Sequence, residues 1–266
     1  MDRASVKRFL ETTNKPRILV VGDIILDEYW WGNINRISPE APVSVVDLAT
    51  ETFTLGGAGN VAKNLSALGS QVALVGVIGA DDKGDKIKKS LANLNIDSQG
   101  VIVDPGRPTI SKIRIMAQNQ QVIRVDREER KDISPEISMI IMNSIRESLS
   151  SVSGVIISDY NKGLLNKEIL RSIITECRLN NKKIFVDPKG RDFSKYCQAN
   201  YLTPNKREAE IASGITIHTE EDLVQVAKTF INYLSLEGLL ITRGREGMSL
   251  FAPGTEPIHI PSQIKE

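Results

Sequence analysis

The sequence predicts an α/β fold in which a mostly parallel sheet is flanked by helices and carries a small antiparallel β lid. Two observations indicate this class. Short apolar runs alternate with amphipathic stretches along the 266 residues, which is the pattern of βαβ units with right-handed crossovers. Two further stretches, 29–48 and 109–125, hold β-branched or alternating runs with no helix-like segment nearby. We expect one domain over residues 1–266, with these two stretches inserted in it.

The main sheet is predicted from its apolar runs. The first is Arg17-Ile-Leu-Val-Val-Gly22, and a continuous run of this kind is typical of a strand buried on both faces. Similar runs follow at residues 71–77, 154–158, 183–186, 199–202 and 238–242. Helix-like stretches lie between them, at residues 60–68, 83–94, 135–149, 167–180, 206–213 and 220–234. Two helices have clear starts, Ser134-Pro135 and Thr219-Glu220, each a capping residue followed by a good first-turn residue.

The two inserted stretches contain Val43-Ser-Val-Val46, Ile113-Arg-Ile-Met116 and Val122-Ile-Arg-Val125. We interpret them as antiparallel strands of a smaller sheet, which would form a natural lid over a site on the main domain. Pattern alone leaves the alternative open that they are extra edge strands of the main sheet.

Composition excludes several classes of protein. With 34 Lys+Arg against 33 Asp+Glu the formal charge is +1, so nothing indicates a nucleic-acid coat or a polybasic membrane surface. No run approaches the roughly 20 apolar residues that span a bilayer, and the charged start is unlike a signal peptide. Two cysteines, Cys177 and Cys197, cannot build a disulfide framework or a four-thiolate zinc site. We expect a cytoplasmic protein without membrane or nucleic-acid partners.

Polar residues follow the predicted strands at the ends where an open parallel sheet binds its ligands. The segments concerned are residues 22–27, 158–163, 187–190, 203–208 and 242–247. One such segment would be weak support, because Asp and Asn cap helices routinely. All of them fall on the same predicted rim, and their carboxylates and lysines suit a hydroxylated substrate together with a phosphorylated one.

A glycine-rich segment, Leu55-Gly56-Gly57-Ala58-Gly59-Asn60, leads into a predicted helix. It is not a Walker P-loop, because no Gly-Lys-Ser/Thr follows. We also exclude a dinucleotide fingerprint, because no predicted strand leads straight into it. By itself it indicates a tight turn before a helix, where glycines let a ligand approach the free backbone N–H groups.

Several of these motifs occur in a characteristic order. They are Gly22-Asp23 with Asp27, Gly56-Gly57-Ala58-Gly59-Asn60, Asp187-Pro188-Lys189, Asn205-x-x-Glu208 and Thr242-Arg243-Gly244-x-x-Gly247. In this order they resemble the ribokinase-like (PfkB-type) carbohydrate kinases, from about residue 15 to the end. Residues 22–32, 36–43 and 119–126 narrow the resemblance to bacterial kinases that phosphorylate D-glycero-D-manno-heptose 7-phosphate at C1, on the route to ADP-heptose and lipopolysaccharide.

The resemblance implies a role for each motif, with ATP and Mg²⁺ as cofactors. Asp27 and Asn60 would bind sugar hydroxyls beside Gly56 and Gly57, while Asp23 would assist them or only cap. Cations for the phosphate that the sugar already carries would come from Arg36, Lys112, Arg114 and Arg124, although each alone could be a solvated side chain. Lys189, or less directly Lys162, would neutralise phosphate charge. The nucleotide would lie against Asn205, Lys206, Arg207, Glu208, Thr242, Gly244 and Gly247. Glu208 would hold the magnesium through water, its alternative being a plain first-turn acid.

The resemblance also implies a motif that this sequence lacks. Members of the family carry Gly-Ala-Gly-Asp after the strand that here would be Ile258-His-Ile-Pro261, and its Asp is the general base. The chain ends at Glu266, so we assign no catalytic residue within it. We expect a shortened kinase, inactive for that reason. The alternatives are a natural short relative that binds sugar phosphate without catalysis, or a kinase for another sugar phosphate or a nucleoside. Pairing of lid strands predicts a homodimer.

Overall fold

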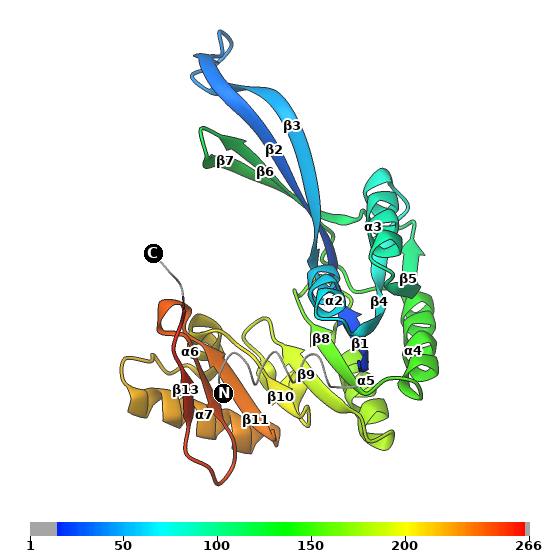
Figure 1. The fold of residues 1–266 in the computed structure, drawn as a ribbon, viewed down its shortest axis with the longest axis vertical. Helices are drawn as coiled ribbons and strands as arrows, with labels where there is room; N and C mark the ends of the chain where they lie inside the picture. The colour runs from blue at the N-terminus through cyan, green and yellow to red at the C-terminus, as the bar shows by residue number, and fades with distance from the viewer. Residues whose placement is uncertain (1–14, 264–266) are drawn as a thin grey trace.

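A computed structural model describes residues 15–263 of the chain. These residues form a nine-stranded sheet and a separate four-stranded sheet (Figure 1). We call the four-stranded sheet the arm and the remainder the α/β body. No helix within residues 15–263 is long and apolar enough to cross a bilayer.

The body sheet is mostly parallel, as predicted. Across the sheet its strands are β13 (Ile258–Ile260), β12 (Met248–Phe251), β11 (Gly238–Thr242), β10 (Tyr201–Leu202), β9 (Lys183–Asp187), β8 (Gly154–Ser158), β1 (Arg17–Gly22), β4 (Gln71–Gly79) and β5 (Asp97–Asp104). All neighbours from β11 to β5 are parallel. Only β12 and β13 are antiparallel additions at one edge. The sequence did not predict β5 or β12, because both lie toward the edges and their polar residues interrupt any apolar run.

The helices cover the sheet unequally. Those of the body are α2 (Ala58–Ala67), α3 (Asp82–Asn93), α4 (Pro135–Leu149), α5 (Lys167–Leu179), α6 (Lys206–Ser213), α7 (Glu220–Leu234) and the single turns η1 (Phe193–Tyr196) and η2 (Gly244–Glu246). The larger apolar core joins α4, α5 and α7 to one face of the sheet. A smaller core joins α2 and α3 to the other face beside β1 and β4. Each amphipathic helix thus buries its apolar stripe on a sheet whose strands are apolar on both faces.

Capping side chains begin the helices where the sequence predicts. Ser134 accepts a hydrogen bond from the backbone N–H of Ile137 at the start of α4. Thr219 and Asp222 form a reciprocal capping box at the start of α7. Caps of this kind satisfy N–H groups that have no partner within the helix.

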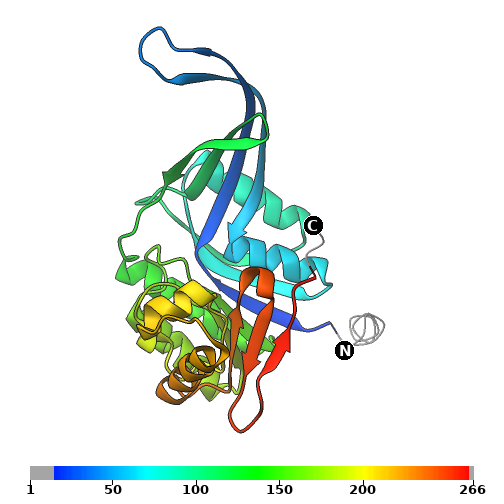
Figure 2. The same ribbon diagram turned by 90° about the vertical axis from the view of Figure 1, so that its left-hand side faces the viewer.

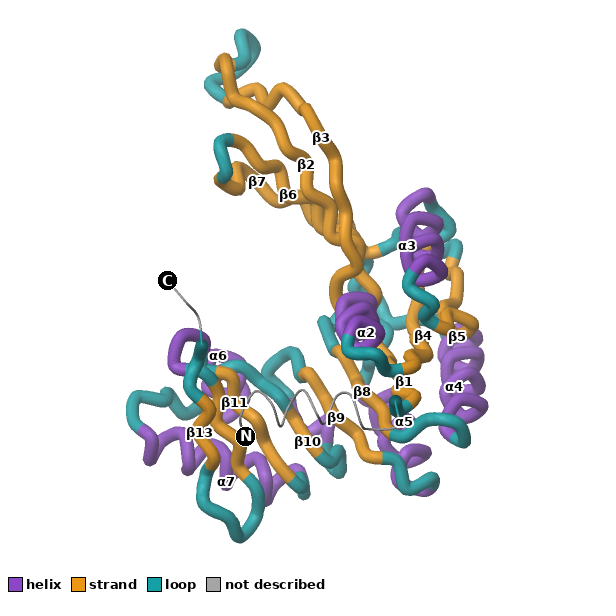
Figure 3. The backbone as a smooth tube through the Cα atoms, viewed as in Figure 1, coloured by secondary structure: helices purple, strands orange, loops and turns teal. Residues whose placement is uncertain are grey.

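The arm consists of β2 (Ile24–Ile37), β3 (Ser44–Gly57), β6 (Ile110–Ala117) and β7 (Gln120–Arg127), in the order β3-β2-β6-β7. Figure 3 shows it as strand along nearly its whole length. It is a sheet of its own, so the alternative of extra edge strands on the main sheet is wrong. Its hairpins are antiparallel, but β2 and β6 are parallel, which corrects the expectation of a purely antiparallel lid. β2 and β6 both leave the body at the same end, and they therefore run in the same direction.

Two of the arm's strands, β2 and β3, join the body without connecting loops (Figure 2). β2 begins two residues after β1 ends, and β3 runs directly into α2. The expectation that no strand leads into the glycine-rich segment is therefore wrong. At the junction the Ala58 N–H donates to the carbonyl of Asp23 at 2.9 Å. Gly57 has a φ of 55°, and a Cβ there would lie 2.2 Å from that carbonyl, so only glycine fits this junction.

Candidate functional site

The carboxyl ends of the parallel strands meet at one edge of the body sheet. Gly22 at the end of β1 is paired with Ser158 at the end of β8, and Ser158 is paired with Asp187 at the end of β9. An isolated bridge joins Asn205 to Thr242 at the end of β11. The polar segments chosen from the sequence therefore lie on one rim, where open α/β sheets bind ligands.

A cleft of about 390 Å³ opens on this rim. We call it the rim cleft; its lining residues are Asp159, Tyr160, Asp187, Pro188, Lys189, Thr203, Asn205, Glu208 and Thr242. Burial, together with the nearby carboxylate of Glu208, raises the pKa of Asp187 to about 6. Three carboxylates and one ammonium thus line a polar hollow, which is a donor set suited to a hydrated cation and a phosphorylated ligand.

Glu208 and Lys189 contact one another in the rim cleft. Lys189 Nζ lies 2.7 Å from Oε1 of Glu208, and Oε2 of Glu208 accepts the backbone N–H of Asn205 at 3.0 Å. Asn205 in turn accepts the N–H of Glu208, which completes a capping box at the start of α6. Glu208 therefore does cap the helix, and its remaining lone pairs face the cleft.

The other residues expected at the nucleotide are spread around the rim cleft. Thr242 lines it, whereas Lys206 and Arg207, on the first turn of α6, and Gly244 and Gly247, around η2, are not among its lining residues. Both glycines have positive φ, 61° and 92°. A Cβ on Gly247 would lie 2.0 Å from the carbonyl oxygen of Ile260, so this glycine is required for β13 to pass close by.

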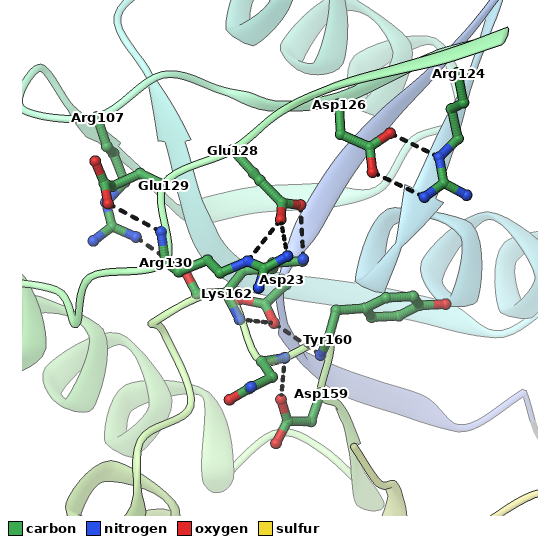
Figure 4. A network of polar contacts seen from close by, with 11 residues as sticks. Asp23, Arg107, Arg124, Asp126, Glu128, Glu129, Arg130, Asp159, Tyr160 and Lys162 are labelled. Atoms are coloured by element: carbon green, nitrogen blue, oxygen red, sulfur yellow. Dashed lines mark hydrogen bonds and ion pairs between the residues drawn. The ribbon is translucent and has the colours of Figure 1, made fainter. Parts of the chain in front are cut away.

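Asp23 is turned toward the backbone of the neighbouring rim segment (Figure 4). Its Oδ2 accepts the N–H groups of Tyr160 at 2.8 Å and Lys162 at 3.3 Å, and the residue is only 2% exposed. Burial raises the pKa of Asp23 to about 6, although the Tyr160 N–H lowers it. Of the two roles expected for Asp23, these contacts favour capping of backbone N–H groups over assistance in sugar binding. The carboxylate fixes the loop that follows β8.

A second group of polar residues lies at the base of the arm. We call Asp27, Gly56, Asn60, Lys112 and Arg114 the arm-base group. Asp27 on β2 pairs with Arg114 on β6, at 2.6 Å between Oδ1 and Nη1. A Cβ on Gly56 would lie 2.2 Å from Oδ2 of Asp27, so glycine is needed here to leave room for the carboxylate. Asn60 is exposed in the first turn of α2, directly after the glycines.

Lys112 and Tyr160 connect the arm-base group to the rim cleft. Lys112 is the register partner of Asp27 on the adjacent strand. Its Nζ lies 5.5 Å from the centre of the Tyr160 ring, and Tyr160 lines the rim cleft. Burial lowers the pKa of Lys112, which has no ion pair at 4 Å or less with any carboxylate of residues 15–263. Lys112 is thus the cation of this group that is free to meet a further anion.

The other predicted cations are placed differently. Arg36 lies near the tip of the arm, nine residues along β2 from Asp27, or about 30 Å at 3.3 Å per residue. Arg36 and Asp27 of one chain therefore cannot contact the same small sugar. Arg124 makes a bidentate pair with Asp126, at 2.8 and 3.0 Å. Lys162 pairs with Glu128 at 2.7 Å, which leaves it facing the base of the arm rather than the rim cleft (Figure 4).

The sequence-based reasoning gave no role to the tyrosines at the site. Tyr29 lies on the same face of the arm as Asp27, and the guanidinium of Arg114 is 5.2 Å from the centre of its ring. Tyr160 stands between the two groups, and Tyr196 is fully buried behind the rim. Tyr160 follows Asp159 on a rim segment, which was a usable signal. Nothing in the local sequence marks Tyr196.

The described residues do not form a metal site from side chains alone. Among residues 15–263 no three His, Cys, Asp or Glu side chains gather as a metal site. His259 Nδ1 lies 2.8 Å from the hydroxyl of Ser249 and 3.9 Å from Oε2 of Glu220, and no group of three ligands forms around it within the described residues. A magnesium ion at the rim cleft would therefore keep much of its hydration, as Mg²⁺ usually does.

The fold that carries this site is that of a known protein family. The model of the pfkB family of carbohydrate kinases matches residues 15–266, and the chain belongs to this family. Among curated proteins, it is 45% identical over 266 residues to the bifunctional protein HldE of Trichlorobacter lovleyi, covering all of this chain and 54% of that protein. The corresponding protein of Geobacter sulfurreducens is 41% identical over the same length, again with 54% of it covered. The chain thus spans about half the length of these relatives.

Solved structures show the same fold at low identity. Phosphofructokinase-2 from Escherichia coli in complex with fructose-6-phosphate superposes with a TM-score of 0.76 at 17% identity, over 94% of this chain and 81% of that one. Arabidopsis thaliana ribokinase complexed with ribose and ATP superposes with a TM-score of 0.71 at 19% identity, over 93% and 78%. The ribokinase-like α/β fold predicted from the sequence is confirmed.

Proposed function

We propose that this chain is the kinase part of a protein that transfers the γ-phosphoryl group of ATP to the C1 hydroxyl of D-glycero-β-D-manno-heptose 7-phosphate, in ADP-heptose synthesis for lipopolysaccharide. Membership of the pfkB family and full-length similarity to bifunctional HldE proteins support this proposal. The observation that carries it is the placement of Lys112. It lies between the Asp27 carboxylate, suited to hydroxyl groups, and the rim cleft, suited to phosphates.

On the sugar side, Asp27 accepts hydrogen bonds from sugar hydroxyls, and Asn60 both accepts and donates them. An ionised carboxylate held by Arg114 is a strong, oriented acceptor, and Gly56 leaves it the space it needs. Lys112 binds the 7-phosphate, because its ammonium is partly desolvated and has no carboxylate partner among residues 15–263. Arg124 is held by Asp126 and serves as a secondary cation.

On the nucleotide side, the residues of the rim cleft fit ATP with a hydrated magnesium ion. Glu208 and Asn205 hold the ion through water, and Lys189 neutralises phosphate charge beside them. Lys206, Arg207, Gly244 and Gly247 border the nucleotide beyond Thr242. When bound, the magnesium offsets charge on the triphosphate.

Phosphoryl transfer forms a bond from the sugar C1 oxygen to the γ-phosphorus and breaks the bond to the β,γ-bridging oxygen, and the hydroxyl proton leaves to a base. Asp159 is unsuited to accept it, because Lys195, Tyr196 and the Asn161 N–H already donate to its carboxylate. Asp23 accepts two backbone N–H groups. Neither of these two carboxylates is therefore the base, and we assign to residues 15–263 the binding and orientation of the two ligands.

Binding measurements test this function directly. We expect calorimetric titration to show that the chain prefers heptose 7-phosphate over fructose 6-phosphate and ribose. Lys112→Met should weaken binding of heptose 7-phosphate by about tenfold or more, the effect of losing one charge-assisted hydrogen bond, and leave ribose unaffected. Lys88→Met, an exposed lysine on α3, is the matched control. Preference for ribose or fructose 6-phosphate in titration, or in a coupled assay with ATP, would refute the proposal.

We also propose a homodimer formed through the arm, in the cytoplasm. The face of the arm opposite Asp27 carries Phe53, Ile113, Ile115, Ile123 and Val125, since cross-strand partners share a face. Phe53, Ile123 and Val125 are about half exposed, and a second copy of the same face would bury them. The thiols of Cys177 and Cys197 are free, as expected of a reducing compartment.

Light scattering coupled to gel filtration tests the dimer. We expect the wild type to be dimeric and Ile123→Asp to be monomeric. Gln121→Asp, on the same strand but paired with Met116 on the other face, should stay dimeric. A monomeric wild type, or a dimer that tolerates Ile123→Asp, would contradict this arrangement.

A further inference from the structure

Tyr196 joins two segments of the rim from behind. It belongs to the single-turn helix η1, and its side chain is fully buried. Its hydroxyl donates to Oδ2 of Asp159 at 2.6 Å and accepts the backbone N–H of Lys189 at 2.9 Å. One phenol thus links the segment that follows β8 to the turn that follows β9.

The Asp159 end of this link is fully satisfied. Lys195 Nζ lies 2.6 Å from the same Oδ2, and Oδ1 accepts the Asn161 N–H at 2.6 Å. Buried carboxylate oxygens need hydrogen-bond partners of this kind. Burial, with the charge of Asp159 beside it, raises the pKa of Tyr196, so the phenol keeps its proton and remains a donor.

The Lys189 end leads into the rim cleft. The turn at residues 187–190 carries Asp187 and Lys189, both of which line the cleft. Gly190 ends the turn with a φ of 99°, and a Cβ there would have no atom within 4 Å, so packing does not hold this end of the turn. The side chain of Lys189 reaches Glu208 at 2.7 Å. The Tyr196 hydroxyl therefore fixes the backbone from which Lys189 reaches the cleft.

We propose that Tyr196, supported by Lys195, is a positioning residue for the rim cleft: it holds the Asp187–Gly190 turn so that Lys189 meets the phosphates of the bound nucleotide. The identity of that nucleotide rests on the proposed function. The link itself rests only on the contacts between Tyr196, Asp159 and the Lys189 backbone.

The test compares Tyr196→Phe with Tyr201→Phe. Tyr201 contacts Glu237 at the opposite end of the sheet, so its variant loses a similar hydrogen bond away from the rim. In Tyr196→Phe we expect the Lys189 amide to exchange its hydrogen about tenfold faster by NMR. We expect affinity for ATP·Mg²⁺ to fall about tenfold while affinity for heptose 7-phosphate stays within about twofold. Tyr201→Phe should change none of the three values.

A second variant guards against loss of folding. Lys195→Met removes one donor to Asp159 and leaves the tyrosine in place, and it should give the same pattern with smaller changes. Unchanged exchange at Lys189 in a folded Tyr196→Phe overturns the proposal, as does an equal loss of affinity for both ligands. If the wild type binds no ATP·Mg²⁺, the proposed function fails, and the exchange rate of the Lys189 amide alone decides the role of Tyr196.

Discussion

Replacing Gly56 by alanine should disable Asp27 without changing Asp27 itself. The added Cβ would lie 2.2 Å from Oδ2 and 3.0 Å from Cγ of that carboxylate. Non-bonded atoms rest at about 3.5 Å, so the carboxyl group must move by about 1 Å. A shift of this size breaks the 2.6 Å contact with Arg114 and moves the acceptor away from any sugar hydroxyl placed by it. A hydrogen bond to a charged group contributes about 1.5–3 kcal/mol. Sugar-phosphate affinity should therefore fall about tenfold to a hundredfold.

Calorimetric titration of a double-mutant cycle measures whether the effect passes through Asp27. Gly56→Ala and Asp27→Ala should each weaken binding of heptose 7-phosphate, and the double variant should be no worse than Asp27→Ala alone. The matched control is Gly154→Ala, where the nearest heavy atom to a new Cβ lies 3.4 Å away. Independent, additive losses would refute the reasoning, since Gly56 would then act on something other than the carboxylate. Full affinity in folded Gly56→Ala would refute it as well.

Three further perturbations address other parts of the molecule. Asn60→Ala should weaken sugar-phosphate binding by about 1–3 kcal/mol in the same titration, and unchanged affinity would remove Asn60 from the site. Burial raises the pKa of Asp23 from 3.8 to about 6, so ionising Asp23 in the folded protein lowers the free energy of unfolding. This loss develops as the pH rises through that interval. Relative to the wild type, Asp23→Asn should therefore gain about 2–3 kcal/mol between about pH 4 and pH 7 in urea unfolding, and a constant difference would contradict this. Lys83→Met leaves Glu28 buried without its main partner and should cost about 3–5 kcal/mol of unfolding free energy, much of which Glu28→Gln in addition should restore. A loss below about 1 kcal/mol would mean that the pair is not effectively buried.

The parallel sheet was predictable because parallel strands that are buried on both faces have unbroken runs of apolar residues in the sequence. Residues 17–22 were predicted with the bounds that β1 has in the structure. The rim followed from the same prediction, since polar residues placed directly after such strands must meet at one edge. The arm was harder. Its strands alternate between a polar face toward Asp27 and an apolar face opposite, and they extend well beyond the runs at residues 43–46 and 113–116.

The pairing of charges at the site could not be predicted. Arg114 contacts Asp27 because β6 lies beside β2 in a register that brings together residues 87 positions apart. No local pattern records that register. For the same reason the sequence suggested several cations for one phosphate, whereas the structure engages Arg114, Arg124 and Lys162 with carboxylates. The role of a buried tyrosine such as Tyr196 could not be predicted either. In the sequence it looks like a core residue, and only the fold shows where its hydroxyl points.

The direct continuity of the arm with the body makes the arm a lever. β2 and β3 are each 14 residues long, or about 45 Å when extended. Both strands are anchored at the Asp23–Ala58 contact and have no loop to absorb a rotation. A tilt of about 5° at this fulcrum therefore displaces the far end of the hairpin by about 4 Å on that length. Adjustments around Asp27 that are too small to see locally are magnified at residues 38–43, where a fluorescent or spin label would report occupancy of the arm-base group from a distance.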